Sequence, residues 1–293
     1  MKRIIYLIAV LFLGFSSLSK AETIDGVIDA RLKDVTIIIS SCDKYAELWE
    51  PFAKLIFKYW PSLKTYNKNV PIILITNKKP FSFKGIQNFQ TGEDKSWSDN
   101  MLQVLSHVKT KYVLYLQEDY FLSQPVNDEF LCYLIKKMEQ NHIPYIQLNQ
   151  DTASYADTQK PFFSVKNSII KSQYLGYRTA LQAAFWKKDV FEWLIKKNES
   201  PWEFESYGGM RSAGMRSPFL AIVKDYPITF VNAINLGFWQ EGSLEFLRQE
   251  GIDIKTVLPV AKDYPFTLWL KNNYPKIFPY WKTFLKFIGY SLP

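Results

Sequence analysis

The hydrophobic and polar positions along the chain predict buried strands that alternate with amphipathic helices. Residues 35–41 form an apolar run rich in β-branched side chains, and residues 70–76 form a second such run. Runs of this kind are typical of strands buried on both faces of a sheet. Between them, apolar side chains recur at spacings of three and four residues, which predicts a helix that ends before Pro61. Those apolar positions are Tyr45, Leu48, Trp49, Phe52, Leu55, Ile56 and Tyr59.

The alternation of strands and helices continues further along the chain. Ser96 is placed to cap a helix that carries apolar side chains up to Val108, and residues 111–118 form a third buried strand. Residues 127–140 have a helical pattern and residues 144–148 an extended one. A β-α-β-α-β order implies an α/β fold with a mostly parallel sheet covered by helices on both faces. Ligands bind such sheets at the edge formed by the C-terminal ends of the strands, so we expect the chemistry there.

The two ends of the chain differ from this α/β region. Residues 1–21 combine the positive charges of Lys2 and Arg3 with a short apolar run, the pattern of a secretory signal peptide. The alternatives are an uncleaved anchor and a buried helix; signal and anchor both predict an exported body, by the positive-inside rule. We therefore expect an α/β domain over residues 33–261 and a helical extension over residues 262–293. The expected location is outside the cytosol, whether secreted, periplasmic or lumenal.

Composition and charge narrow the classes of function. The formal net charge of +8 falls to +5 without residues 1–21, and a net +4 of that remainder lies in residues 262–293. This basic and aromatic stretch predicts peripheral membrane contact, with a helix folded onto the domain as the alternative. No nucleic-acid-binding motif accompanies it, so we expect no nucleic-acid partner. Two cysteines and two histidines argue against a disulfide framework and against a histidine metal centre.

Two adjacent carboxylates, Glu118 and Asp119, follow the third predicted strand. Such a pair is costly at the point where a buried strand reaches the surface unless solvent, a partner or a cation compensates it. Carboxylate ligands suit Mg²⁺ or Mn²⁺, which often take one or two of them together with phosphate oxygens. The alternative is that both acids simply begin a loop. No glycine-rich loop follows any predicted strand, which disfavours Rossmann and P-loop phosphate sites.

Several of these segments, taken in their order, resemble a known family. They are residues 35–45, 97–100, 112–120, 181–186 and 199–205. Together they are similar to the nucleotide-sugar half of GT-A-fold glycosyltransferases, in particular the family-2-like bacterial enzymes that build surface polysaccharides. The resemblance implies a single GT-A-like domain and a hexosyltransferase-like enzyme. It also implies a nucleotide-sugar donor, a glycan or glycolipid acceptor, and an inverting transfer assisted by Mn²⁺ or Mg²⁺.

The resemblance assigns donor contacts at the ends of the strands. The acid that follows the first strand in this family contacts the base or the ribose, and Asp43 matches that position, with Ser41 beside it. A second polar position before the acidic motif commonly touches the nucleotide, and Asp99 matches it. The resemblance therefore implies that these side chains bind the donor.

The acidic motif of the family binds the ribose and the metal that bridges the diphosphate. Glu118 and Asp119 match it, with Asp119 as the first choice for the metal ligand and Glu118 as the second. Tyr120 stands where a common form of the motif has a third acid, and this departure favours an alternative function. That alternative is a non-catalytic exported carbohydrate-binding protein on the same fold. Arginines that could offset the diphosphate charge are Arg178, Arg211 and Arg216.

An inverting transfer needs a base that takes the proton of the acceptor hydroxyl. The resemblance places a carboxylate for this role at the start of a helix, where Glu203 is the first choice and Glu205 and Glu199 are alternatives. Glu203 also fits the third position of a capping box, so it could serve the helix alone. Trp186 and Trp202 are candidates for a wall against the acceptor sugar, with core packing as the alternative for each.

Overall fold

The computed structural model describes residues 32–66, 70–149, 163–165, 168–172, 178–235 and 237–260, together with positions 270, 273, 274 and 280. The predicted signal or anchor lies outside these described residues, as does nearly all of the predicted C-terminal extension. In the described part of the chain, no helix has the length and apolar character that a membrane crossing requires.

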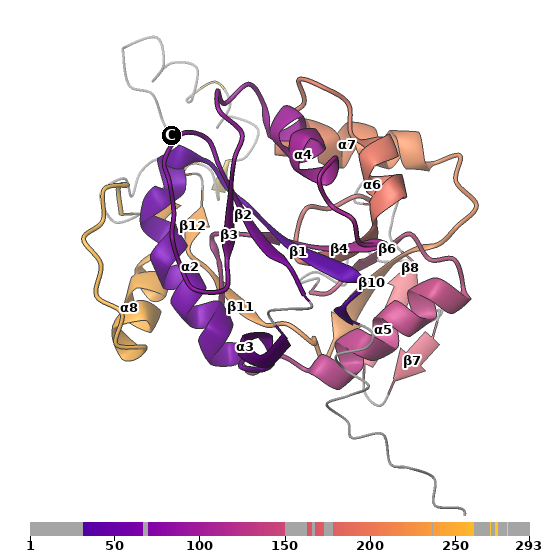
Figure 1. Cartoon of the computed structure of the whole chain (residues 1–293), viewed down its shortest axis with the longest axis horizontal. Helices are drawn as coiled ribbons and strands as arrows, with labels where there is room; N and C mark the ends of the chain where they lie inside the picture. The colour runs from indigo at the N-terminus through magenta and orange to yellow at the C-terminus, as the bar shows by residue number, and fades with distance from the viewer. Residues whose placement is uncertain are drawn as a thin grey trace, which may run out of the picture.

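A nine-stranded sheet lies at the centre of the described residues (Figure 1). From one edge to the other its strands are β3 (Gln87–Gln90), β2 (Ile72–Thr76), β1 (Val35–Ser40), β4 (Tyr112–Gln117), β9 (Ala184–Lys187), β6 (Tyr145–Gln147), β10 (Phe219–Lys224), β8 (Ser168–Ser172) and β7 (Phe163–Val165). Strands β3, β2, β1 and β4 pair in parallel, and β10 pairs in parallel with β6. Strand β9 runs antiparallel between β4 and β6, so these six parallel-paired strands share one direction. The predicted α/β class with a mostly parallel sheet is confirmed.

Helices cover both faces of the sheet, as the sequence predicts. One face is covered by α2 (Ala46–Tyr59), α3 (Ser62–Tyr66), α5 (Asp128–Gln140) and α8 (Glu241–Gln249). The other is covered by α4 (Trp97–Leu105), α6 (Lys188–Leu194) and α7 (Pro201–Ser212). The α4 cap is confirmed, because the Ser96 side chain accepts a hydrogen bond from the Asp99 backbone N–H, but the helix ends three residues before Val108.

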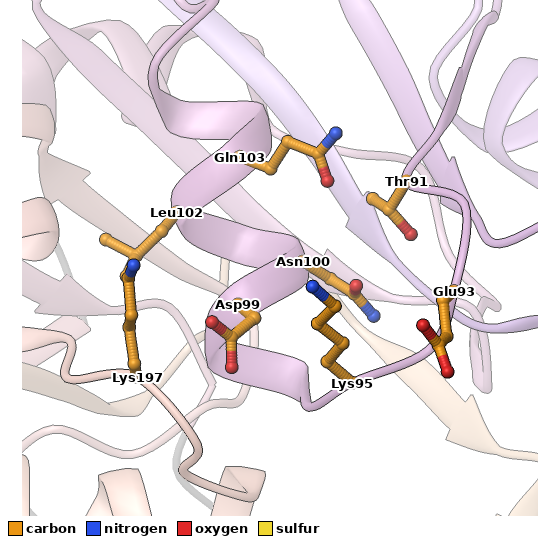
Figure 2. Close-up of a pocket in the computed structure, with 8 residues that line it drawn as sticks. All are labelled: Thr91, Glu93, Lys95, Asp99, Asn100, Leu102, Gln103 and Lys197. Carbon is orange, nitrogen blue, oxygen red and sulfur yellow. The ribbon is translucent and has the colours of Figure 1, made fainter.

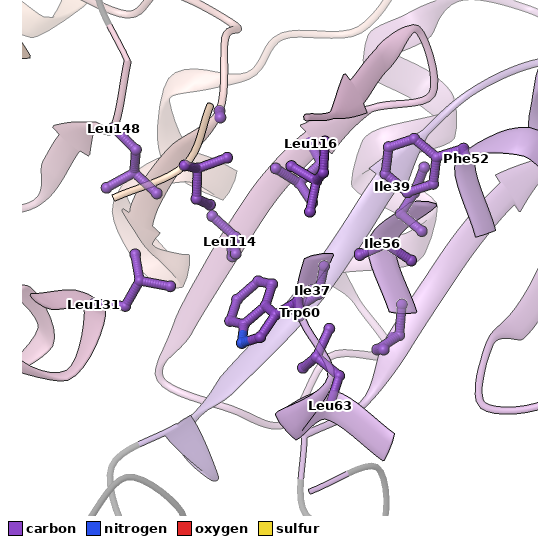
Figure 3. Packing of buried hydrophobic residues seen from close by; sticks show 14 of the residues in the cluster. Ile37, Ile39, Phe52, Ile56, Trp60, Leu63, Leu114, Leu116, Leu131 and Leu148 are labelled. Carbon is purple, nitrogen blue, oxygen red and sulfur yellow. The ribbon is translucent and has the colours of Figure 1, made fainter. Parts of the chain in front are cut away.

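The pleat of the buried strands sends alternate side chains into different cores. Ile37 and Ile39 of β1 pack on the α2 side, where Phe52 and Ile56 meet them (Figure 3). Ile38, between them in the sequence, packs on the α4 side. A continuous apolar run is needed here because both faces of the strand are buried.

Short elements then fix the chain beyond the sheet edge. Strand β5 (Tyr120–Leu122) begins just after the acidic pair and pairs antiparallel with β11 (Phe230–Asn232). The remaining elements are the short 3₁₀ helix η1 (Asp43–Tyr45) and the pair β12 (Ile234–Asn235) and β13 (Phe238–Trp239). The ends of β1, β2 and β4 therefore lie at one edge, with β5 and β11 beside them.

Candidate functional site

The acidic pair lies where β4 ends, at the edge that the sequence predicts for the chemistry. The Glu118 backbone N–H donates to the Ser40 carbonyl at 3.4 Å, and the Asp119 carbonyl accepts from the Ala233 N–H at 2.7 Å. The Glu118 side chain is buried. The Asp119 Oδ1 atom is buried as well and has no hydrogen-bond partner among the described residues. The backbone is thus held on both sides while one carboxylate oxygen is left without compensation.

Burial also controls the charge of this pair. It raises the pKa of Glu118 well above the usual range, and the neighbouring Asp119 charge adds to the effect. Burial likewise raises the pKa of Asp119. Two adjacent carboxylates with little solvent cannot both be ionised at low cost unless a cation or a proton compensates them.

The donor set of this pair fits a divalent cation that also binds phosphate. An unpartnered carboxylate oxygen next to a second carboxylate supplies one or two hard ligands, which is the share that Mg²⁺ or Mn²⁺ usually takes from a protein at a phosphate site. Among the described residues, no three side chains of His, Cys, Asp or Glu are grouped so that they could hold a metal. The chain can therefore supply a partial ligand set here, which a diphosphate and water would have to complete.

Tyr120 follows the acidic pair in the chain and is the first residue of β5. Its ring stacks on Phe230, with 4.3 Å between the ring centroids and 19° between the planes. Burial raises the pKa of the Tyr120 phenol, and the charges of Asp119 and Glu205 contribute to the shift. The phenol thus lies within the electrostatic range of both Asp119 and Glu205.

Glu205 is the acid of α7 whose surroundings best suit a base. Its Oε1 accepts the backbone N–H of Leu181 at 2.6 Å, which fixes the orientation of the carboxylate. Burial raises the pKa of Glu205, although that hydrogen bond opposes the shift. A carboxylate with a raised pKa is a stronger base toward a hydroxyl proton.

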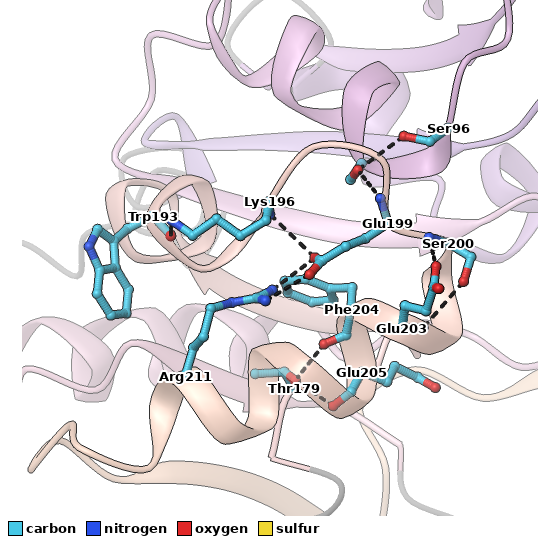
Figure 4. Close-up of polar contacts among 11 residues, drawn as sticks. Ser96, Thr179, Trp193, Lys196, Glu199, Ser200, Glu203, Phe204, Glu205 and Arg211 are labelled. Carbon is cyan, nitrogen blue, oxygen red and sulfur yellow. Dashed lines mark hydrogen bonds and ion pairs between the residues drawn. The ribbon is translucent and has the colours of Figure 1, made fainter.

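The other two acids of this segment have structural roles (Figure 4). Glu203 is exposed, accepts the Ser200 backbone N–H at 2.8 Å and completes a capping box, and these bonds lower its pKa. Glu199 is buried and forms a two-pronged ion pair with Arg211, at 2.7 and 2.8 Å. Glu203 and Glu205 therefore differ in burial and in the direction of their pKa shifts, and the choice of the base between them stays a prediction.

Two contacts of Glu199 fix the start of α7, the helix that carries Glu203 and Glu205. The Glu199 backbone N–H donates to the Ser98 side chain at 2.9 Å, and the Ser98 N–H donates to the Glu199 carbonyl at 3.2 Å. These bonds tie the entry of α7 to the first turn of α4. The start of the helix that carries Glu205 is thereby fixed relative to α4.

Asp43 joins the loops that follow β1 and β2. Its carboxylate accepts the backbone N–H groups of Asn77, Lys78 and Lys79, each at 2.9 Å. In return, the Asn77 side-chain oxygen accepts the Asp43 N–H at 3.0 Å. Burial acts to raise the pKa of Asp43, but the hydrogen bonds outweigh it and the pKa is lowered. The sequence reasoning did not place Asn77 in the site, although this residue directly follows the second strand.

Ser41 is also held by the fold. Its hydroxyl oxygen accepts the indole N–H of Trp49 at 2.7 Å, which ties the loop after β1 to helix α2. The donor contacts implied for Ser41 and Asp43 stay predictions, and both side chains serve the loop structure as well.

Asp99 lies beside a polar hollow of about 570 Å³ (Figure 2). The residues that line it are Thr91, Glu93, Lys95, Asp99, Asn100, Leu102, Gln103 and Lys197. The Asp99 carboxylate accepts the Ser96 hydroxyl at 2.6 Å and the Asn198 backbone N–H at 3.0 Å, and these two bonds lower its pKa. Neither Glu118 nor Asp119 lines this hollow, so the structure does not bring Asp99 together with the acidic pair there.

The two tryptophans expected at the acceptor occupy opposite environments. Trp186 is 0% exposed and stacks on Phe191, with 4.5 Å between the ring centroids. A fully buried indole offers no surface to a sugar, so the structure corrects this expectation and gives Trp186 a core role. Trp202 is 74% exposed on α7, and its acceptor contact stays a prediction.

The arginines proposed for the diphosphate are engaged elsewhere or exposed. The Arg178 guanidinium donates to the carbonyls of Met215 and Ser217 and lies over the Phe219 ring. Arg211 is paired as described above, and Arg216 is exposed. The structure therefore brings none of these arginines into contact with the acidic pair among the described residues.

Comparison with solved structures finds proteins of similar fold. TarS 1-349 from S. aureus is 12% identical with a TM-score of 0.38, over 66% of this chain and 59% of that one. Mannosyltransferase PcManGT from Pyrobaculum calidifontis, in complex with GDP-Man and Mn²⁺, is 12% identical with a TM-score of 0.46, over 70% of this chain and 58% of that one. UTP-bound UGPase from Acinetobacter baumannii is 9% identical with a TM-score of 0.39, over 66% of this chain and 86% of that one.

This chain thus spans less than two thirds of the length of TarS 1-349 and PcManGT. No protein-family model and no curated protein matches it. With identities of 9–12% and TM-scores below 0.5, these similarities concern the fold and carry no argument about function.

Proposed function

We propose that the protein is a glycosyltransferase that moves a sugar from a nucleotide-sugar donor to a hydroxyl group of a glycan or glycolipid acceptor. The observation that carries this proposal is the acidic pair at the end of β4, where the buried Asp119 Oδ1 has no partner beside a buried Glu118. The carboxylate of Glu205 supports the proposal as well, since its charge and that of Asp119 both act on the phenol of Tyr120. The site thus combines a cation-binding pair with a separate base.

The acidic pair explains how an anionic donor is accepted. A diphosphate beside buried carboxylates is repelled unless positive charge separates them. A divalent cation held by Asp119, with Glu118 as the second ligand, would supply that charge and stabilise the departing diphosphate. The chain's own part is to hold these two oxygens at the sheet edge through the backbone bonds of Glu118 and Asp119.

The transfer itself needs one base and a single displacement. The Glu205 carboxylate takes the proton of the acceptor hydroxyl as that oxygen attacks the anomeric carbon. The bond from this carbon to the donor phosphate breaks, and its electron pair leaves with the nucleoside diphosphate. Attack opposite to the leaving group inverts the configuration at the anomeric carbon.

A second candidate is a carbohydrate-binding protein that has kept the fold without the chemistry. Tyr120 favours it, because a phenol replaces a third acid in the motif and stacks on Phe230 as an aromatic platform. For either function we propose an exported protein, on the strength of the signal-like residues 1–21.

Donor binding tests the proposal directly. Thermal unfolding of the full chain is measured with UDP-, GDP-, CMP- and dTDP-sugars, with and without Mn²⁺. A donor at 100 times its dissociation constant adds about 2.7 kcal/mol of stability. We expect one donor class to stabilise the protein only with Mn²⁺, and Asp119→Ala to abolish that dependence. No stabilisation by any donor would refute the transferase, whereas stabilisation by free oligosaccharides alone would support the binding protein.

A further inference from the structure

Large apolar side chains of α6 and α7 are exposed to solvent. The exposed fractions are 56% for Trp193, 74% for Trp202, 49% for Tyr207 and 68% for Met210. Helices α6 and α7 contact one another, so these residues belong to neighbouring elements (Figure 1). We call them the α6–α7 aromatic face. Exposed apolar patches rimmed by polar residues mark sites of interaction with proteins, membranes or ligands.

Helix α7 is apolar on two opposite sides. At 100° per residue, Trp202, Tyr207 and Met210 lie within an arc of about 140° on its outer side. Phe204 and Gly208 lie on the inner side and are buried against the domain. The inner side accounts for the packing of the helix, and a surface helix normally carries polar residues opposite. The fold therefore gives no reason for the outer apolar residues.

Exposed basic residues follow α6 and α7 in the chain. Lys196, Lys197 and Arg216 are exposed, and none of them has a carboxylate within ion-pair distance among the described residues. Nearby cations that do have an acidic partner are Lys187, Lys188 and Arg211. Glu203 is the acid on the outer side of α7, and its carboxylate accepts the Ser200 N–H. Lys197 also lies at the polar hollow with Asp99, whose pKa it helps to lower, so three exposed cations stand against Glu203 and Asp99 and leave a small net positive charge.

We propose that the α6–α7 aromatic face docks on an anionic lipid surface. Tryptophan and tyrosine favour the boundary between lipid and water, because each has an apolar ring and a polar group. Lysine and arginine next to them attract anionic headgroups. The face lies on the outer sides of two helices, and none of its aromatic residues lines the polar hollow beside Asp99. Small-ligand sites are concave, so this face is not of that kind.

The proposal rests on this surface alone and does not depend on the proposed transferase activity. It does have a consequence for that activity, because Glu205 is on α7 as well. Docking places the candidate base within about one helix diameter, 10–12 Å, of the lipid. An acceptor that is anchored in the lipid would then reach it.

A local fluorescent probe tests the docking without interference from other segments. The full chain with Cys42→Ser and Met210→Cys carries an environment-sensitive NBD label at position 210; Cys132 is buried and stays unlabelled. The matched control carries the label at Val257→Cys; Val257 is 87% exposed, and its backbone N–H donates to Glu47 at the start of α2, which packs on the other face of the sheet. Vesicles of phosphatidylcholine mixed with phosphatidylglycerol are compared with vesicles of phosphatidylcholine alone.

We expect a blue shift at position 210 with anionic vesicles, quenching of that label by a lipid-phase quencher, and neither effect at position 257. The double variant Lys196→Gln, Lys197→Gln should bind anionic vesicles about 30-fold more weakly, since each basic residue near the surface contributes about fivefold to the affinity. An unchanged label at 210 while the chain sediments with vesicles would overturn the proposal. So would an equal shift with neutral vesicles, or a concentration-dependent shift without vesicles, which would indicate contact between copies of the chain.

Discussion

Replacing Glu205 by glutamine separates the role of this acid from that of Glu203, two positions away on the same helix. In the wild type the Leu181 backbone N–H donates to Glu205 Oε1 at 2.6 Å. Glutamine keeps an oxygen that can accept this bond, so we expect its side chain to stay in the same position. It cannot take a proton. Glu203→Gln is the matched control, because glutamine also completes a capping box and the exposed side chain has no other described role.

The expected magnitudes differ for the two variants. Loss of a positioned general base lowers kcat by about 10²–10⁴-fold, which corresponds to roughly 3–5 kcal/mol in the activation barrier. Glu205→Gln should therefore lose transfer to this extent while donor binding stays the same. Glu203→Gln should stay within about threefold of the wild-type rate, because it removes no base under this assignment.

The pH dependence gives an independent readout. Because burial raises the pKa of Glu205, the transfer rate should rise with pH through a value above that of an ordinary carboxyl group, about 4.3. The folded state binds this proton more tightly than the unfolded state, so the charged Glu205 reduces stability once the pH passes the unfolded pKa. Glu205→Gln should thus be at least as stable as the wild type at pH 7, although it is inactive.

The assay follows release of nucleoside diphosphate with the donor found by thermal unfolding, across pH 4 to pH 9. Donor affinity is measured in parallel for both variants. Full activity of Glu205→Gln would refute the assignment of the base. A large loss in Glu203→Gln with normal unfolding would return the role to Glu203.

Other side chains make separable predictions. Asp43→Asn should lose about 1–3 kcal/mol at pH 7, because the amide cannot accept all three backbone N–H groups. Since the pKa of Asp43 is lowered, this stabilisation is present above about pH 3.9 and disappears as the pH falls through the folded pKa, which unfolding at several pH values will show. Glu199→Gln should cost about 2–4 kcal/mol, and Arg211→Met should recover part of it in a double-mutant cycle, as the pair keeps only 10% and 22% side-chain exposure. Trp186→Ala should lose about 3–5 kcal/mol, whereas Trp202→Ala should leave the unfolding temperature unchanged.

The buried strands and their helices could be predicted because their signals are local. Each central strand is a short apolar run, and the alternation of Ile37 and Ile38 between two cores needs nothing beyond the pleat. The acidic pair could be placed for the same reason, since a residue that follows a buried parallel strand must emerge at one edge. The insertion of β9 between β4 and β6 could not, because its partners are far away in the sequence.

The choice between Glu203 and Glu205 shows where local reasoning ends. The capping box that includes Glu203 can be recognised from the four consecutive residues 200–203, and the structure confirms it. The Glu205 carboxylate is held by the backbone N–H of Leu181, 24 positions earlier in the chain, and no periodicity indicates that contact. The hydrogen bonds from the loop after β2 to Asp43 could not be predicted either, because the residues they join are 34 or more positions apart in the sequence.

The two sides of helix α7 differ in their contacts, and the difference links the candidate base to the α6–α7 aromatic face. The inner side packs Phe204 against the domain and holds Glu205 by a bond from Leu181. The outer side exposes Trp202 and Met210, which the fold does not use. A helix that served packing alone would be polar outside, and one that served a lipid alone would not bury a carboxylate and raise its pKa. The pairing of both sides on one helix is what a transferase needs if its acceptor hydroxyl is presented from a membrane surface.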